Sequence, residues 1–137
     1  MVMWIYQNKE FNESDIGKYV GYVYLITNKT NNRQYIGKKL FWFSKTRTVK
    51  GKKKKEKALS DWQTYWSSSE ELKNDVVTLG EDNFTREILY LCSSKGEMSY
   101  LELKEQMIND VLLKQDQWYN GFVGGKIHRN HVKNLCN

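Results

Sequence analysis

The sequence predicts a single α/β domain of the α+β type, in which strand-like and helical segments are mixed. Three observations carry this prediction. Two runs rich in β-branched and aromatic residues, Gly21–Thr27 and Arg33–Gly37, are separated only by an Asn-rich turn. A third such run covers Phe84–Cys92. Segments with apolar residues at helical spacing lie on either side of this third run.

The first two runs predict a β-hairpin, because the intervening Asn28–Asn32 segment has the composition of a tight turn. The next stretch, up to Lys57, is dense in lysine and poor in apolar residues, and we interpret it as an exposed loop. The Phe84–Cys92 run, half alternating and half continuously apolar, predicts a third strand.

Two helices are predicted. The first covers Ser60–Leu79, with Trp62, Tyr65 and Trp66 at helical spacing, a start signal at residues 67–71 and Gly80 as its end. The second extends from about Glu97 to Leu113, with one apolar face formed by Leu101, Ile108, Val111 and Leu112. The glycine-rich segment from Trp118 to Gly125 is predicted to be coil, followed by a basic tail.

Length and composition define the class of protein. A chain of 137 residues with 39% apolar and 14% aromatic residues can form one packed core, so we expect one domain over residues 1–137. No apolar stretch approaches the ~20 residues that span a bilayer, so no membrane association is expected. The N-terminus lacks a secretory pattern, and Cys92 and Cys136 form no disulfide framework. We therefore expect a cytoplasmic protein.

The positive charge is concentrated in one segment. The formal net charge is +6, and residues 38–57 hold ten basic side chains against one acid, Glu56. The rest of the chain is therefore slightly acidic. Such a basic stripe is typical of proteins that bind a phosphate backbone. The alternative is a solvated lysine-rich loop that only aids solubility.

The sequence resembles the GIY-YIG nuclease superfamily. Tyr22-Val23-Tyr24 and Tyr35-Ile36-Gly37, ten residues apart, are similar to its signature hairpin. The segments that follow also have the superfamily's order: a basic segment, a strand, a glutamate-bearing helix and the pair Tyr119-Asn120. The core of the resembling domain would therefore cover about residues 20–121. The segment from Asp61 to the serines at 67–69 is most similar to a phage-type branch of candidate homing endonucleases. Tyr22 stands where the superfamily has glycine, and the segment after the second motif is longer and more basic.

The resemblance implies a small antiparallel three-stranded sheet flanked by helices, and a DNA endonuclease in a bacterial or phage-infected cell. Tyr24 would activate the attacking water, Tyr35 would orient it, and Lys38 would help Tyr24 to ionise. Arg47 is our assignment for the phosphate clamp, with Lys45 and Lys50 as alternatives. Gly37 would let DNA approach the backbone closely.

Glu102 is our assignment for the ligand of a divalent cation, Mg²⁺ or Mn²⁺, because one carboxylate with water and phosphate oxygens forms a normal Mg²⁺ site. Two alternatives stay open at this point. Ser99 and Glu102 have capping-box spacing, in which case Glu102 would only stabilise the helix start. Glu105, one turn further along, borders the same apolar stripe and is the other candidate ligand.

Double-stranded DNA is the expected partner. The residues assigned to DNA binding are Lys39, Lys45, Lys50, Lys52, Lys53, Lys54, Lys55 and Asn120. Asn120 would hold the last coil against the site, unless it is an ordinary turn residue. We expect loose sequence preference, or specificity supplied by a homo-oligomer or a partner protein. The alternative functions are a catalytically inactive nucleic-acid-binding module and, less favoured, a protein-interaction domain.

Overall fold

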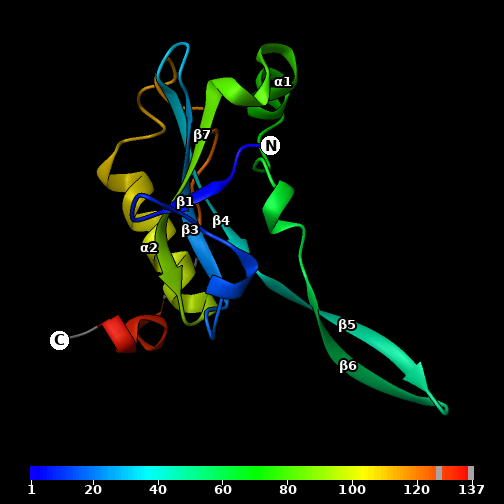
Figure 1. Ribbon diagram of the computed structural model, residues 1–137. Helices are drawn as coiled ribbons and strands as arrows, with labels where there is room; N and C mark the ends of the chain where they lie inside the picture. Colours follow the sequence, from blue (N-terminus) through cyan, green and yellow to red (C-terminus); the bar gives the residue numbers. More distant parts are fainter. Residues whose placement is uncertain (126–127, 136–137) are drawn as a thin grey trace.

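The computed structural model of the chain describes residues 1–125 and 128–135 (Figure 1). Its strands are β1 (Trp4–Tyr6), β2 (Lys9–Glu10), β3 (Gly21–Asn28), β4 (Arg33–Leu40), β5 (Trp42–Val49), β6 (Lys52–Leu59) and β7 (Phe84–Cys92). Its α-helices are α1 (Glu70–Leu79) and α2 (Lys95–Ile108), and its 3-10 helices are η1 (Glu13–Asp15), η2 (Trp62–Thr64), η3 (Glu81–Asn83) and η4 (Arg129–Leu135). Within this described part of the chain, no helix has the length and apolar character needed to span a membrane.

Five strands form the main sheet, in the order β2-β1-β7-β3-β4. Strand β3 pairs antiparallel with β4 on one side and with β7 on the other. The predicted α+β fold with an antiparallel three-stranded sheet is therefore confirmed, and both the hairpin and the third strand lie where expected. The N-terminal segment adds β1, which runs parallel to β7, and β2 at the sheet edge.

The two faces of the sheet have different cores, because successive side chains of a strand point to opposite faces. Tyr22, Tyr24 and Ile26 of β3 belong to an aromatic-rich cluster with residues of the N-terminal segment and α1. Val23, between the first two of them, packs in a second cluster with Ile36 and residues of α2. Helix α2 therefore covers one face, while α1 and the N-terminal segment cover the other (Figure 1).

The first predicted helix is shorter than expected. Helix α1 begins only at Glu70, where the Ser69 hydroxyl accepts a hydrogen bond from Leu72 N, and Gly80 follows its last residue. Trp62 lies in the 3-10 helix η2 and Tyr65 lies in the coil after it, so the aromatic spacing at 62–66 was not a helical signal. The start signal at 67–71 and the end at Gly80 are confirmed.

The second predicted helix begins earlier and ends earlier than expected. Ser94 is its N-cap and accepts a hydrogen bond from Glu97 N. The alternative in which Ser99 and Glu102 form a capping box is therefore excluded, since both residues lie inside α2. The predicted apolar face is only partly buried, because Leu101 and Val111 lie in the core whereas Ile108 and Leu112 are exposed.

The basic segment is not a loop. It forms an antiparallel two-stranded ribbon, β5–β6, which extends away from the body of the molecule (Figure 1). Lys50 and Gly51 form its two-residue turn, with φ of 51° and 77°. Positive φ at both central residues is the turn geometry that matches the twist of paired strands. The loop prediction was wrong because it was based on the absence of apolar residues, which a solvated ribbon does not need.

Candidate active site

The β3–β4 register brings the signature tyrosines together. Tyr24 pairs with Gly37 across the ladder, and Ile26 pairs with Tyr35. The Tyr24 and Tyr35 rings stack with centroids 6.1 Å apart. A Cβ on Gly37 would lie 2.4 Å from the Tyr24 hydroxyl oxygen, so the glycine is required by the tyrosine ring packed over it. This reason lies within the protein, and the close approach of DNA to the Gly37 backbone stays a prediction.

A cleft of about 250 Å³ opens beside these rings. Its lining residues come from β3, β4, the coil before α1, helix α2 and the last coil: Tyr24, Tyr35, Lys38, Tyr65, Ser68, Glu102, Gln106, Phe122, Val123 and Gly124. Four of the five residues assigned to catalysis from the sequence (Tyr24, Tyr35, Lys38 and Glu102) thus line one cleft. The fifth, Arg47, does not.

Glu102 is held near the cationic side chain of Lys38. The Lys38 ammonium donates a hydrogen bond to the Ser99 hydroxyl at 2.8 Å and lies 3.8 Å from a Glu102 carboxylate oxygen. The Glu102 side chain is only 14% exposed. Burial raises the pKa of its carboxyl group, and Lys38 acts in the opposite direction.

Glu105, the alternative ligand, faces elsewhere. Its carboxylate accepts a 2.5 Å hydrogen bond from the Tyr90 hydroxyl, and it is not among the residues that line the cleft. Between the two glutamates, the geometry therefore favours Glu102 for any chemistry in the cleft.

The donor set of the cleft fits a divalent cation of the Mg²⁺ type. In residues 1–125 and 128–135, no group of three or more His, Cys, Asp and Glu side chains is arranged to hold a metal. A zinc-type cage is thus not formed by the described residues, whereas Mg²⁺ needs only one or two carboxylates and keeps several waters. Gln106, one turn after Glu102, also lines the cleft, and its amide oxygen is buried without a hydrogen-bond partner in the described part of the chain.

Asn120 anchors the last coil to the outer edge of β4. Its amide oxygen accepts a hydrogen bond from Ile36 N at 3.1 Å, and its amide nitrogen donates to Ile36 O at 2.8 Å. Gln106 also donates to Ile36 O. Asn120 is buried with both groups bonded, so the structure gives it the coil-holding role and leaves it no group for the predicted contact with DNA.

The outer edge of β4 becomes open at Lys38. Gln34 bonds to the last coil through its N–H and its C=O, and Ile36 does so through the Asn120 amide. Backbone groups of an edge strand point outward at every second residue, so those of Lys38 come next. Within the described part of the chain they pair with no other residue. Lys38 therefore presents both an ammonium and a backbone N–H near the cleft.

Burial governs the protonation of the tyrosines. Tyr24 is 1% exposed, and burial raises the pKa of its hydroxyl well above the ordinary value. Neighbouring tyrosines, first among them Tyr35, add to this effect. Burial also raises the pKa of Tyr35, while its hydrogen bond with Ser68 lowers it. The ammonium of Lys38 bonds to Ser99 and lies near Glu102, and its expected help in ionising Tyr24 stays a prediction.

Arg47 and its two alternatives, Lys45 and Lys50, all lie on the β5–β6 ribbon. Arg47 forms a 3.1 Å ion pair with Glu56 and is 61% exposed. None of the three lines the cleft, so the cleft's cation among the described residues is Lys38. The remaining residues assigned to DNA binding on the ribbon, Lys52 to Lys55, are exposed along β6. Lys39 is at the ribbon's base.

Lys39 has partners within the protein. Its ammonium forms a 2.6 Å ion pair with Asp61 and lies 4.0 Å from the centre of the Tyr65 ring. The side chain is only 20% exposed. It therefore helps to fix the coil that carries Tyr65, in addition to any contact with DNA.

Tyr65 and Ser68 are cleft residues that the sequence analysis missed. Tyr65 packs edge-to-face against Tyr24, and Ser68 hydrogen-bonds to Tyr35. Arg86 fixes this coil from below, since its guanidinium donates to Tyr65 O at 2.9 Å and lies against the Trp4 and Trp66 rings. Arg86 occupies a buried position in the alternating pattern of β7. A charged residue at a buried position needs partners within the protein, so this pattern could have indicated the contact between Arg86 and the coil.

The comparisons with known proteins agree with this geometry. The family model described as "Putative endonuclease segE, GIY-YIG domain" matches residues 4–123. No curated protein and no solved structure gives a match. The matched range contains every strand of the sheet, both tyrosines of the hairpin, Glu102 and Asn120. This chain therefore belongs to the segE-type family of GIY-YIG endonuclease domains.

Proposed function

We propose that this protein is a metal-dependent endonuclease that hydrolyses phosphodiester bonds of double-stranded DNA. The observation that carries the proposal is the convergence of Tyr24, Tyr35, Lys38 and Glu102 around one cleft. Hydrolysis of a phosphodiester needs an activated water, a cation for the charge that develops on the phosphate, and a group that orients the reactants. The cleft offers a residue for each requirement.

Glu102 is the proposed ligand of Mg²⁺ or Mn²⁺. A bound divalent cation would stabilise negative charge on the phosphate oxygens and lower the pKa of nearby water and phenol groups. Because burial raises the pKa of Glu102, its carboxylate is better stabilised by a second positive charge than by Lys38 alone, at 3.8 Å. This supports a cation at Glu102.

Tyr24 is the proposed general base for the attacking water, and Tyr35 orients it. The raised pKa of Tyr24 means that its hydroxyl is protonated in the free protein at neutral pH. Tyr24 must therefore first release its own proton to solvent, which the positive charge of a bound cation would favour, and the phenolate can then accept a proton from the attacking water. Tyr35 is fixed by Ser68, so its hydroxyl has a defined direction towards the cleft.

Lys38 takes the phosphate-binding role that the sequence analysis gave to Arg47. Its ammonium lines the cleft, and its backbone N–H points outward at the open edge of β4. An ammonium and a backbone N–H can together donate hydrogen bonds to a phosphate oxygen. In other enzymes, groups of these two kinds stabilise the negative charge that develops in the transition state.

The test is nicking of supercoiled plasmid in Mg²⁺ or Mn²⁺ by the wild type and by Glu102→Gln, with Glu105→Gln as the matched control. We expect Glu102→Gln to lose at least ~10²-fold of the rate, as expected when a group that acts in the transition state is removed. Glu105→Gln should keep the rate within a few-fold. DNA binding in EDTA should survive in both variants.

Two outcomes would contradict this assignment. If clean wild-type protein binds DNA and nicks none with either metal, the chain is the catalytically inactive binding module. If Glu105→Gln loses activity and Glu102→Gln keeps it, the cation is bound at Glu105, outside the cleft.

A further inference from the structure

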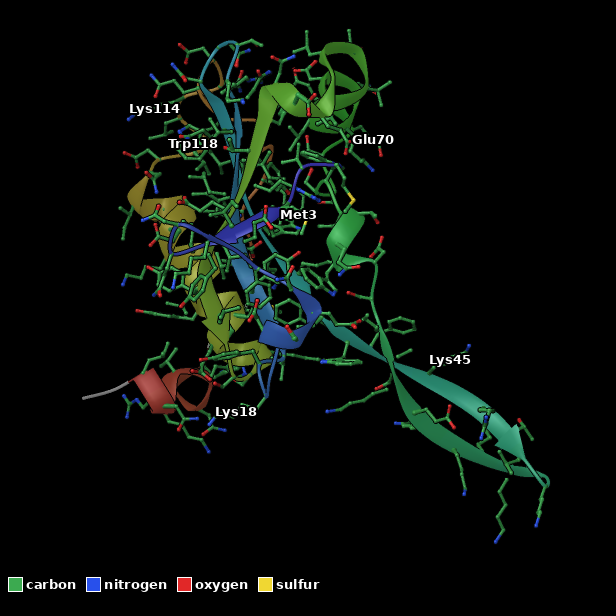
Figure 2. All side chains as sticks on the ribbon, in the orientation of Figure 1. Met3, Lys18, Lys45, Glu70, Lys114 and Trp118 are labelled. Carbon is green, nitrogen blue, oxygen red and sulfur yellow. The ribbon has the colours of Figure 1, made fainter. Side chains whose placement is uncertain are left out.

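The β5–β6 ribbon lies outside the packed body of the protein. Figure 2 shows its side chains pointing into solvent on every side, with Lys45 labelled on β5. Residues 43–48 and 52–57 are all exposed, and only the two ends of β5 and the last two residues of β6 are partly buried. A solvated arm of eight residues per strand contributes little to stability, so its role is sought in binding.

The strand register divides the ribbon into two unlike faces. Ser44 pairs with Lys57, Thr46 with Lys55, and Thr48 with Lys53. These six residues share one face because alternate positions of paired strands point the same way. We call this the hydroxyl–lysine face. It has hydroxyl groups along β5, lysines along β6, and no acid.

The opposite face is partly neutralised. There Lys45 pairs with Glu56, and Glu56 also forms the 3.1 Å ion pair with Arg47. The acid of the ribbon is thus confined to this face. The opposite face also carries Lys52 and Lys54, so both faces keep a net positive charge. The hydroxyl–lysine face differs in having no acid and a row of hydroxyl groups beside its lysines.

The dimensions suit a groove of duplex DNA. Eight residues at ~3.4 Å per residue give a ribbon of about 27 Å. The major groove, about 12 Å wide, admits a two-stranded ribbon in undistorted DNA, whereas the minor groove of about 6 Å admits one only when the duplex is deformed. The two-residue turn at Lys50 and Gly51 keeps the tip narrow and places one more cation there.

The base of the ribbon leads to the cleft. A surface hollow of about 720 Å³ is lined by Lys38, Lys39, Phe43, Leu59 and Asp61, among others. Lys38 also lines the candidate active site. A DNA phosphate backbone that runs along the ribbon could therefore continue through this hollow to the cleft.

We propose that the β5–β6 ribbon inserts into the major groove of double-stranded DNA. The lysines of β6 then follow a phosphate backbone, and the hydroxyls of β5 face base edges. The inference rests on the proposed function for the identity of the ligand as duplex DNA. It adds a source of specificity within the chain to the two expectations from the sequence, loose preference and a partner or homo-oligomer.

The first experiment measures binding of the full chain to a labelled duplex in EDTA over a range of salt concentrations. Lys53→Ala, Lys55→Ala and Lys57→Ala are combined in one variant. The matched control combines Lys95→Ala, Lys104→Ala and Lys114→Ala, three exposed lysines on or after α2. We expect the ribbon variant to lose about 30-fold or more in affinity and to lower the slope of log K against log salt by about 2 to 3. Equal effects of the two variants would overturn the proposal.

The second experiment identifies the groove by dimethyl sulfate interference, again in EDTA. Methylation of guanine N7 lies in the major groove, and methylation of adenine N3 lies in the minor groove. We expect interference at guanine N7. Interference at adenine N3 alone, or at neither, would overturn the proposal.

A shortened variant separates this inference from the proposed function. Replacing residues 45–56 by Asn-Gly keeps the Ser44–Lys57 pair and closes the ribbon with a favoured two-residue turn. The guanine interference should disappear, while plasmid nicking with Mg²⁺ at low salt persists at a reduced level. If interference persists, the groove inference fails. If the wild type shows the guanine interference and never nicks, the proposed function fails and the groove inference stands.

Discussion

The cleft and the ribbon meet at Lys38 and Lys39 and hold their functional side chains in opposite ways. In the cleft, Tyr24 is 1% exposed and packs against the rings of Tyr35 and Tyr65. On the ribbon, the side chains are in solvent and only the backbone ladder is ordered by pairing (Figure 2). Bond cleavage needs reacting groups at fixed positions, whereas attraction to phosphates needs only charge on a suitable frame. The proposed function and the proposed groove binding thus assign these two needs to separate regions of the molecule.

The electrostatics of the two regions differ in the same sense. Burial raises the pKa of Tyr24 and that of Glu102. The protonation state of each group therefore depends on whether a cation or a phosphate is bound in the cleft. On the ribbon, the ion pair of Arg47 with Glu56 involves side chains that are 61% and 44% exposed. Such a pair contributes about 0–1 kcal/mol to stability. We therefore expect substitutions in the cleft to change rate or stability, and those on the ribbon to change affinity.

Tyr24→Phe should have the largest effect. Removing a general base lowers the rate by about 10²- to 10⁴-fold. Single-turnover nicking at saturating protein measures this directly. Tyr22→Phe is the matched control, because Tyr22 is equally buried on the same strand but does not line the cleft.

The pH profile sharpens the same test. Since the pKa of Tyr24 is raised, the ionised fraction increases about tenfold per pH unit at any pH below that pKa. The wild-type rate should therefore increase with pH across the neutral range, and Tyr24→Phe should lose this dependence. A variant that keeps both the rate and the pH slope would remove Tyr24 from the role of base.

Asn120→Ala should affect stability, with an effect intermediate in size. The substitution leaves the buried N–H of Ile36 without a partner and frees the last coil from the edge of β4. Loss of a buried hydrogen-bond partner costs about 1–3 kcal/mol. Urea unfolding measures this change in the free energy of unfolding, with Lys53→Ala on the ribbon as the control. The control should change it by less than about 0.5 kcal/mol, and equal losses would contradict the division between the two regions.

The body of the protein was more predictable than the ribbon. The β3–β4 hairpin and β7 follow from residue patterns in which apolar side chains mark the buried positions. The ribbon lacks an alternating apolar pattern, because residues 52–57 are polar and exposed on both of its faces. Lysine is also depleted in strands, so the composition argued against pairing. The Lys50-Gly51 turn was the remaining signal.

The candidate site was predictable where it follows the hairpin and unpredictable where it depends on tertiary placement. Tyr24, Tyr35 and Lys38 come together through a local register. Tyr65 was missed because Trp62, Tyr65 and Trp66, spaced as in an α-helix, were interpreted as one, whereas Trp62 lies in η2 and Tyr65 lies in the coil that Arg86 fixes. Arg47 was misplaced because order along the chain does not reveal that residues 42–59 leave the body.

Arg47→Ala should have the smallest effect and tests that last point. Because Arg47 lies on the ribbon and pairs with Glu56, its loss should weaken DNA binding by only a few-fold, in line with one lost phosphate contact. The single-turnover rate at saturating protein should stay within about twofold of the wild type, since a group away from the reacting atoms contributes to binding and not to the chemical step. Arg47→Lys, which keeps the charge, should restore most of the affinity. A rate loss of ~10²-fold at saturating protein, which Arg47→Lys fails to restore, would contradict this expectation. It would mean that the ribbon folds back and places the Arg47 guanidinium at the scissile phosphate. The division of the molecule into a region for chemistry and a region for binding would then be wrong.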